Sequence, residues 1–326
     1  MNGRGPTSHD VAREAGVSQS AVSRAFTPGA SVSPQMREVI EAAAERLGYR
    51  PSRLPGMMRR GKSGIVAVVV GGLYNPFHTI TLESFTRALT AAGKQTLLVR
   101  IDNDRELDDA VGDLVSLRVD GVLSALSIAS AEAASELDRH QLPIVMLNSA
   151  VETDWVRCIN SDNEGAGRLA AQLLHGSGSR RLTSIMGPRS ALSHSRRAVG
   201  FADALRLLGV EALHSFHGEL DYDWGRQVAT KMVDMSDRPD GIFCGNDLIA
   251  AGLIDCWAKA GLQAPQDFRI IGYDNMPLAS WDHYDLTSFD QQTDAMAEIA
   301  VGLLEVHASS EISCTIDPAL VRRKSC

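Results

Sequence analysis

The hydrophobic pattern divides the chain into a short helical head and a longer body in which strands and helices alternate. In the head, polar residues that can cap a helix precede three stretches with helical periodicity, at residues 10–15, 19–26 and 34–47. Gly16 and Gly48 follow the first and third stretches, where glycine commonly ends a helix. The pattern therefore predicts three short helices in the first 50 residues.

The third predicted helix has a strong start signal. Ser33 can cap it, and Pro34 occupies the first helical position, where a missing N–H is harmless. Five apolar residues recur at helical spacing and predict one buried face, formed by Met36, Val39, Ile40, Ala43 and Leu47.

The first two helices are joined by a short turn, Gly16-Val17-Ser18, which is typical of a helix-turn-helix. Small or branched residues such as Ala12 and Val22 let the two helices cross closely. The other side of the second helix carries polar side chains that are free to meet DNA: Gln19, Ser20, Ser23 and Arg24. A generic three-helix bundle that binds nothing would also have polar outer faces, so this alternative stays open.

Beyond residue 64, apolar runs typical of strands alternate with helical stretches. The expected strands are residues 65–70, 96–101, 121–126, 144–147, 182–186, 214–217, 241–244 and 269–273. The expected helices are residues 78–92, 105–117, 131–140, 164–174, 195–208, 224–235 and 248–260. This alternation predicts two doubly wound subdomains, each a parallel sheet covered on both faces. Ligands of such sheets bind beyond the carboxyl ends of the strands, so a crevice between the subdomains is the expected pocket.

Charge is unevenly distributed along the chain. The formal net charge of −8 argues against a nucleic-acid partner when taken alone. Residues 1–64, however, hold ten Lys and Arg against five Asp and Glu, so the head is basic and the body strongly acidic. A small basic head on an acidic body indicates that the head binds nucleic acid and the body has another role.

Several classes of protein are disfavoured by composition. The longest aliphatic run, at residues 65–70, is far shorter than the roughly 20 residues of a membrane span. The N-terminus has no apolar stretch of a secretory signal. The five cysteines are scattered without a CxxC pair, and the histidines show no metal-ligand spacing. We therefore expect a cytoplasmic protein without a membrane segment, a metal or a cofactor.

Two segments of the head resemble the lac/galactose repressor family of transcriptional regulators. They are residues 10–24, DVAREAGVSQSAVSR, and residues 47–51, LGYRP. The resemblance implies that residues 19–24 lie on a recognition helix in the major groove, where Gln19, Ser20 and Arg24 match the base-reading positions. The positions expected to contact phosphates are Thr7, Ser18 and Ser23.

Residues 52–63 contain a string, GMMRRGKS at positions 56–63, that matches the phosphate-binding P-loop pattern. A P-loop needs a strand before it and a helix after it. Here the order is reversed, which argues against an NTPase. The family resemblance instead implies a hinge that forms a short helix on DNA, with Met58 as an apolar wedge in the minor groove and Arg59 on the backbone. Pro55 and Gly56 depart from the family pattern, and a plain flexible linker remains the alternative.

The resemblance continues through the body in a series of short motifs: NPF at 75–77, DNEGA at 162–166, RAVGF at 197–201, ND at 246–247, GYD at 272–274 and LVRR at 320–323. It implies an all-α helix-turn-helix head, residues 1–51, and a hinge, residues 52–63. The α/β core, residues 64–326, would have two doubly wound parallel-sheet subdomains of the periplasmic-binding-protein type. Their expected ranges are 64–161 with 289–317, and 162–288 with 318–326.

The resemblance also implies an effector site between these subdomains. Asp274 and Arg197 are expected to bind ligand hydroxyls or a carboxylate. Asn246 could bind ligand or only hold a turn, and Phe77 could line the pocket or belong to the core. Further candidates are Asn148, Ser193, Tyr222 and Gln291.

Three classes of function follow from these features. We expect a transcriptional repressor that binds a pseudo-palindromic operator as a homodimer and is controlled by a small polar effector, a sugar or a sugar acid. A periplasmic solute-binding protein would share the body but would not need the basic head. An enzyme would rest on the misplaced P-loop string, and the chain has no G-x-S-x-G motif of a hydrolase.

Overall fold

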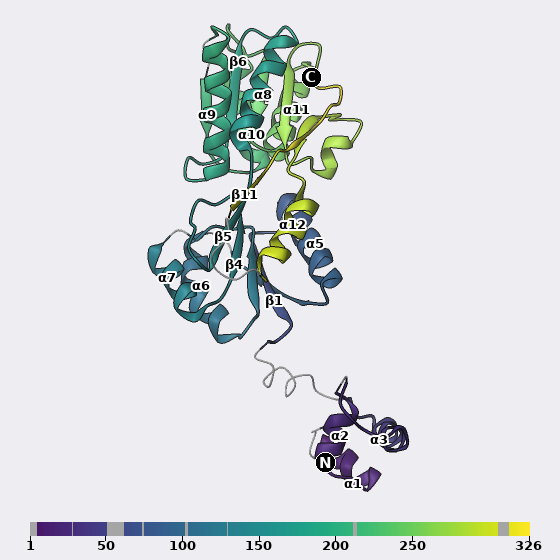
Figure 1. The fold of residues 1–326 in the computed structure, drawn as a ribbon. Helices are drawn as coiled ribbons and strands as arrows, with labels where there is room; N and C mark the ends of the chain where they lie inside the picture. The colour runs from purple at the N-terminus through teal and green to yellow at the C-terminus, as the bar shows by residue number, and fades with distance from the viewer. Residues whose placement is uncertain are drawn as a thin grey trace. The chain divides into compact units, whose positions relative to one another are not determined.

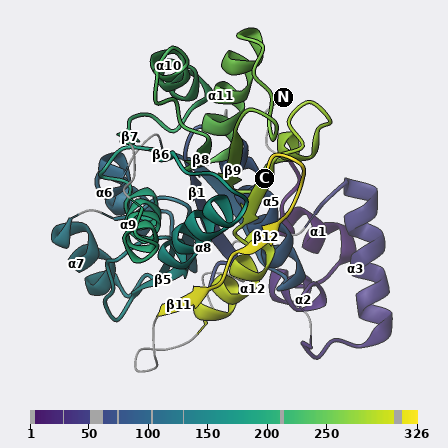
Figure 2. The same cartoon turned by 90° about the horizontal axis from the view of Figure 1, so that it is seen from above.

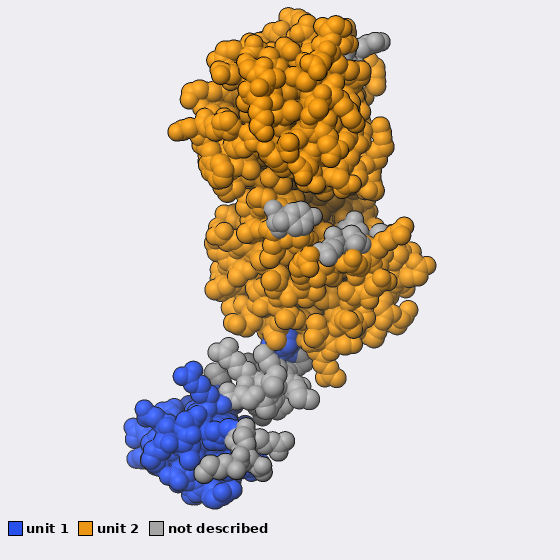
Figure 3. All heavy atoms as spheres, turned by 180° about the vertical axis from the view of Figure 1, so that it is seen from behind, with its two compact units in different colours: residues 1–63 blue, residues 64–326 orange. Residues whose placement is uncertain are grey.

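The computed structural model describes residues 5–27, 29–50, 62–73, 75–101, 104–128, 130–210, 214–305 and 313–326. The chain forms two compact units, residues 1–63 and residues 64–326 (Figures 1 and 3). Each unit has its own buried core.

The first unit contains three helices, α1 (Ser8–Ala15), α2 (Gln19–Ala25) and α3 (Pro34–Leu47). Each begins at a capping side chain, and α1 and α3 end at Gly16 and Gly48 in the left-handed conformation. These two glycines adopt φ values of 68° and 65°, which other residues rarely reach. Local sequence signals thus define all three helices.

The core of this unit is built mainly from alanine and β-branched residues. The predicted apolar face of α3 is partly wrong, because Met36 and Val39 are 41% and 50% exposed. The inward stripe runs through Ile40, Ala43 and Ala44 instead. Near the start of α3, Arg37 turns toward α2 and donates a hydrogen bond to the Ala25 carbonyl oxygen.

The second unit contains two six-stranded sheets, seen from two directions in Figures 1 and 2. The first sheet has the order β11-β5-β4-β3-β1-β2, and all its strands are parallel. Its strands are β1 (Ile65–Val70), β2 (Gln95–Arg100), β3 (Gly121–Ser124), β4 (Ile144–Leu147), β5 (Val156–Ser161) and β11 (Ser313–Ile316).

Four helices cover this sheet: α5 (Pro76–Ala91), α6 (Asp104–Ser116), α7 (Ala131–His140) and α12 (Thr293–Leu303). Alternate residues of β1 belong to two different core clusters: Ala67 and Val69 to one, and Val66, Val68 and Val70 to the other. Both faces of the strand are therefore buried, as its continuous apolar run predicts.

The second sheet has the order β12-β10-β9-β8-β6-β7, and only the edge pair β10–β12 is antiparallel. Its strands are β6 (Leu182–Met186), β7 (His214–His217), β8 (Gly241–Cys244), β9 (Arg269–Tyr273), β10 (Thr287–Asp290) and β12 (Ala319–Val321). The covering helices are α8 (Asn163–Gly176), α9 (Leu192–Leu207), α10 (Tyr222–Met232) and α11 (Asp247–Lys259), with a 3₁₀ turn η1 (Pro277–Ser280).

Strands β5, β10 and β11 and helix α12 were not predicted. The three strands carry polar residues that hide the strand pattern. In β10, for example, Thr287 and Ser288 are buried because other side chains satisfy them: Ser325 Oγ accepts from Thr287 N, and Ser288 Oγ donates to Asp247. β10 spans Thr287–Asp290, so this strand of the second sheet crosses the subdomain boundary that the sequence predicts after residue 288.

Candidate DNA interface and ligand site

Helix α2 presents one apolar and one polar face. Ala21, Val22 and Ala25 are buried in the head core. The polar face is open to solvent at three positions, Gln19, Ser20 and Arg24, and half-buried at Ser23. Among the described residues, none forms a hydrogen bond or an ion pair with the Arg24 side chain. Its guanidinium is therefore available to an external acceptor.

Hydroxyl side chains cap the first two helices. Thr7 and Asp10 form a capping box, in which Asp10 N donates to Thr7 Oγ1 over 3.4 Å and Thr7 N donates to Asp10 Oδ2 over 2.9 Å. The hydrogen bond from the Thr7 hydroxyl lowers the pKa of Asp10. Ser18 accepts from Ala21 N over 3.2 Å and also bonds Ser20 Oγ over 3.0 Å. Both hydroxyls therefore sit at positive helix ends, where anions are favoured.

Two of the predicted DNA-contacting residues, Met58 and Arg59, lie outside the described residues.

Arg197 lies at the centre of the candidate ligand site in the second unit. Its side chain is 2% exposed, and its Nε donates to Asn163 Oδ1 over 2.7 Å. Its Nη1 donates to the Gly245 carbonyl oxygen, and its guanidinium carbon lies 3.5 Å from the centre of the Tyr273 ring. The described residues place no carboxylate within ion-pair distance, so neutral groups hold this buried cation.

Asp274 follows Tyr273 at the end of β9 and is half-buried. Its Oδ1 accepts from Gln291 Nε2 over 2.6 Å. Burial raises the pKa of Asp274, and the nearby Arg197 charge and the Gln291 bond oppose that increase.

Gln291 connects Asp274 to Asn148, whose Nδ2 donates to Gln291 Oε1 over 3.0 Å. Asn148 Oδ1 in turn accepts from Ser161 N and from Asn163 Nδ2, over 3.0 and 3.2 Å. Asn163 also binds Arg197, so one continuous chain of side-chain hydrogen bonds runs from Asp274 through Gln291, Asn148 and Asn163 to Arg197. It joins the end of β4 in the first sheet to the end of β9 in the second.

Two of these residues hold an unusual backbone. Asn148 and Asp274 have φ values of 55° and 96°, in the left-handed region that disfavours residues other than glycine. Such residues cost about 1–3 kcal/mol each and cluster at functional sites.

Phe77 and Ser193 lie at the starts of helices that follow central strands. Phe77 is half-buried in the first turn of α5, after β1, and its ring centre is 5.7 Å from that of His78. Ser193 is half-buried in the first turn of α9, after β6. In each sheet this is the strand at which the chain order reverses, where α/β folds bind ligands.

The side chains of Asn246 and Tyr222 are engaged in structural bonds. Asn246 Oδ1 accepts from Ile249 N over 2.9 Å, and its Nδ2 donates to the Leu220 carbonyl oxygen over 3.0 Å. Tyr222 donates its hydroxyl proton to Asp255 over 2.6 Å, and its pKa is raised to about 12, chiefly by burial. Asn246 therefore holds the turn before α11, and the ligand contact that the resemblance implies for it stays a prediction.

Sequence reasoning missed Ser161, Asn163 and Tyr273, which complete the polar network. The Ser161 hydroxyl lies 2.7 Å from that of Tyr273 and links the two sheets directly. Asn163 follows Asp162 and Tyr273 precedes Asp274, and both neighbours belong to the family motifs. Their position beside a motif residue is the sequence signal that could have identified them as site residues. Asp162 itself caps α8, since its Oδ1 accepts from Gly165 N over 2.8 Å.

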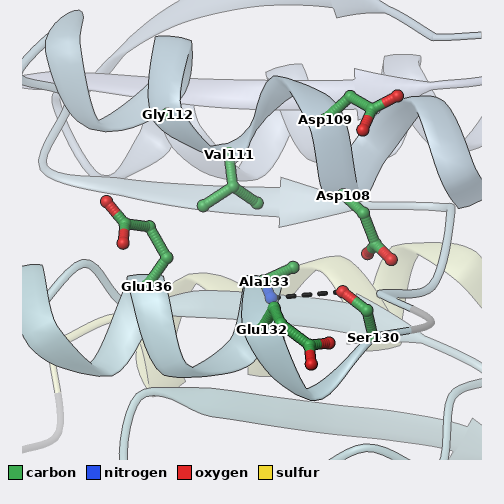
Figure 4. A pocket seen from close by; sticks show the side chains of 8 residues that line it. All are labelled: Asp108, Asp109, Val111, Gly112, Ser130, Glu132, Ala133 and Glu136. Carbon is green, nitrogen blue, oxygen red and sulfur yellow. Dashed lines mark hydrogen bonds between the residues drawn. The ribbon is translucent and has the colours of Figure 1, made fainter.

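A separate shallow pocket of about 340 Å³ lies between α6 and α7 (Figure 4). Half of its lining residues are acidic, and none is a predicted site residue. The lining consists of Asp108, Asp109, Val111, Gly112, Ser130, Glu132, Ala133 and Glu136. It is therefore distinct from the network around Arg197.

In the described part of the chain, no group of three or more His, Cys, Asp or Glu side chains is arranged to hold a metal ion. Among the same residues, no helix has both the length and the apolar character of a membrane span.

Comparison with known proteins assigns both parts of the chain. Residues 7–52 match the description "Bacterial regulatory proteins, lacI family", and residues 171–326 match "Periplasmic binding protein-like domain". Together the two matches cover more than half of the chain. The chain thus joins a DNA-binding domain of the lacI family to a periplasmic-binding-protein-like domain.

Relatives that match nearly the whole chain support this combination of domains. Catabolite control protein A of Priestia megaterium is 29% identical over 97% of this chain and 96% of its own length. The ribose operon repressor of Escherichia coli K12 is 28% identical over 91% of this chain and 92% of its own. A solved complex of the transcriptional regulator CelR with cellobiose is 28% identical, with a TM-score of 0.72, over 98% of this chain and 100% of that one.

These comparisons confirm the expected fold, a helix-turn-helix head with two parallel-sheet subdomains of the periplasmic-binding-protein type. They also confirm the expected class of function, since the related proteins named here are regulators of transcription.

Proposed function

We propose that this protein is a sequence-specific repressor of transcription whose operator affinity is controlled by a small polar effector. The observation that carries the proposal is the outward face of α2, where Gln19, Ser20 and Arg24 are exposed. Side-chain caps stabilise the starts of both α1 and α2. Arg suits a bidentate contact with guanine, and Gln suits adenine.

The hydroxyls of Thr7, Ser18 and Ser23 would position the head on the phosphate backbone. A homodimer would present two such heads to a pseudo-palindromic operator, because two-fold symmetry in the protein requires it in the site. The hinge residues Met58 and Arg59 would add the minor-groove wedge and a backbone contact.

The effector would bind at the polar network in the second unit. Arg197, Asp274, Gln291 and Asn148 offer donors and acceptors there, and Phe77 and Ser193 lie at the neighbouring helix starts. Asn246 and Tyr222 would shape the walls through their structural bonds. Names of the relatives mention ribose and cellobiose, so a sugar or a sugar acid is the proposed class of effector.

Effector binding would act by changing the angle between the subdomains. That change would move the two heads of the dimer relative to the half-site spacing and so alter operator affinity. This role needs no cofactor and no catalytic residue, so we propose that the chain is not an enzyme. A protein that binds DNA in this way would act in the cytoplasm.

Arg24→Ala tests the DNA-reading role. If Arg24 contacts a base edge, the variant should bind operator more weakly by about 1–3 kcal/mol and lose discrimination at one base position. Binding to random DNA should change little. Fluorescence anisotropy on operator, single-base operator variants and random DNA measures all three.

Arg13→Ala is the matched control, because Arg13 lies on α1 with 80% of its side chain exposed. An equal loss on operator and random DNA for Arg24→Ala would show a phosphate contact only. Absence of any operator preference in the unmodified protein would contradict the proposed function itself.

A further inference from the structure

His194 is a buried polar side chain next to the proposed effector site. It lies in the first turn of α9, three residues before Arg197, and is 6% exposed. Its Nδ1 accepts a hydrogen bond from Gly187 N over 3.0 Å, directly after β6. The ring is therefore fixed at the strand end where the order of the second sheet reverses.

This bond determines which ring nitrogen carries the proton. Because Nδ1 accepts from a backbone N–H, the neutral ring keeps its proton on Nε2. Burial, together with the charge of Arg197, lowers the pKa of His194 well below its usual range, which keeps the ring neutral. His194 therefore offers one fixed N–H donor and cannot accept at Nε2.

The Nε2 atom has no partner among the described residues. The fully buried polar atoms without a partner do not include Nε2. Nε2 therefore belongs to the small part of the His194 side chain that is exposed. An N–H donor at the exposed edge of a nine-tenths buried side chain is suited to a bound ligand.

His194 and Arg197 meet at Gly245. A Cβ added at Gly245 would lie 2.3 Å from His194 Nδ1, and the Gly245 carbonyl oxygen accepts from Arg197. Helix α9 carries both side chains, has 16 residues, and has no side-chain cap at its start. Free N–H groups at a helix start favour an anion.

The donors of the site belong to His194, Arg197 and the start of α9. Its carboxylate, Asp274, accepts from Gln291, and among the described residues it forms no ion pair with Arg197. A neutral sugar would leave Arg197 and His194 without a charged acceptor. A ligand that carries both an anionic group and hydroxyls could accept from these donors and also donate to Asp274.

We propose that His194 is a specificity-determining residue, which together with Arg197 selects a polyhydroxylated effector that carries a carboxylate or phosphate group. This proposal rests on the proposed effector site and adds the chemical class of its ligand. The alternative is that His194 only holds the turn after β6.

Two variants separate these roles. In His194→Asn the amide oxygen can replace Nδ1 and accept from Gly187, but no donor reaches the Nε2 position. In His194→Gln the amide nitrogen can replace the Nε2 donor. His140→Gln is the control, because His140 is exposed on α7 in the other subdomain.

The first probe is inorganic phosphate, tested on the full chain against chloride at equal ionic strength by thermal unfolding. Phosphate stabilises folded proteins in general, so the difference between variants is the relevant quantity. We expect a saturable phosphate-specific increase in melting temperature for the unmodified protein and His140→Gln, at least halved in His194→Asn and retained in His194→Gln. An equal increase in His194→Asn and the control would overturn the proposal.

The second probe is a set of matched sugars: aldonic acids, sugar phosphates and their neutral parents, titrated by calorimetry. We expect an acid or a phosphate to bind at least tenfold more tightly than its neutral parent, and this ratio to fall within twofold of unity in His194→Asn. The two anionic arms distinguish carboxylate from phosphate. The proposal would be overturned if a neutral sugar bound as tightly as its acid. It would also be overturned if inorganic phosphate bound and no sugar derivative bound more tightly than phosphate.

Operator binding without effector is measured in parallel. If the unmodified protein binds no operator, the proposed function fails whatever the ligand results. If it binds operator and responds to neutral sugars only, the proposed function stands and the role of His194 fails.

Discussion

At the scale of single residues, the buried carboxylate of Asp247 in the second unit is an instructive case. Its side chain is fully buried at the start of α11. Its Oδ2 accepts from Met276 N and its Oδ1 from Ser288 Oγ, each over 2.7 Å. Two neutral donors satisfy its oxygens, but burial still raises the pKa of Asp247 well above its usual range.

This raised pKa predicts the pH dependence of stability. The folded state holds the proton more tightly than the unfolded state, so the stability contributed by protonated Asp247 is complete below its ordinary pKa. That contribution is lost as the pH rises from the ordinary pKa to the folded-state pKa, at about 1.4 kcal/mol for each pH unit between the two. Asp247→Asn, which keeps an acceptor and can donate to Ser288, should remove this slope and be more stable than the unmodified protein at pH 7.

Melting temperatures from pH 4 to 8 measure this effect. Asp267→Asn is the control, because Asp267 is exposed. A parallel pH profile for Asp247→Asn and the unmodified protein would contradict the prediction.

At the scale of elements, capping side chains combine a local and a functional role in the head. Ser18 and Ser33 each accept from a backbone N–H three residues ahead, over 3.2 and 3.3 Å. Only Ser18 starts the proposed recognition helix. The two serines therefore form a matched pair with the same cap and different positions.

Ser18→Ala and Ser33→Ala should each destabilise the head by about 1 kcal/mol through the lost cap. Only Ser18→Ala should further weaken binding to both operator and random DNA, because a phosphate contact carries no sequence information. Urea unfolding and anisotropy provide the two measurements. Equal DNA binding by the two variants, at temperatures where both heads are folded, would remove Ser18 from the interface.

Glycines set the close approach of α8 and α9, on which the network depends. A Cβ at Gly200 would lie 2.0 Å from the Glu164 carbonyl oxygen, and one at Gly167 would lie 2.2 Å from the Arg197 carbonyl oxygen. These helices carry Asn163 and Arg197, whose 2.7 Å hydrogen bond requires this approach.

Gly200→Ala should therefore destabilise the second unit by about 1–3 kcal/mol, since the two backbones must move apart. It should also weaken effector binding, because Arg197 moves with its helix. Gly176→Ala is the control, as a Cβ there meets nothing within 4 Å. Chemical unfolding measures the stability of the two variants, and ligand titration measures their effector affinity. Unchanged affinity in Gly200→Ala would show that the network tolerates the shift.

At the scale of the whole molecule, the two units have separate cores. Among the described residues, the head core is built from α1 to α3 and the segments beside them, and four clusters fill the two faces of each sheet in the second unit.

A fragment of residues 64–326 should therefore fold, form dimers and bind effector with an affinity within about twofold of the full chain, because its cores are complete. It should not bind DNA. Light scattering and calorimetry on the fragment measure these properties. An insoluble or ligand-blind fragment would show that the head contributes to the second unit.

The sequence by itself determined the elements whose signals are local. The caps Thr7, Ser18 and Ser33 and the end signals Gly16 and Gly48 place the head helices, and continuous apolar runs place strands such as β1. These signals act within a few residues, so no knowledge of distant contacts is needed to interpret them.

Only the tertiary structure decided which polar residues are buried and where they meet. β5 and β10 carry polar side chains, and distant partners bind some of them, as Tyr273 binds Ser161 and Asp247 binds Ser288. Their sequences therefore do not show a strand pattern. In the same way, the link from Asn148 to Gln291 joins residues 143 positions apart, and His194 becomes a fixed donor only through Gly187. A hydrogen bond depends on positions in space, and the local sequence does not contain them.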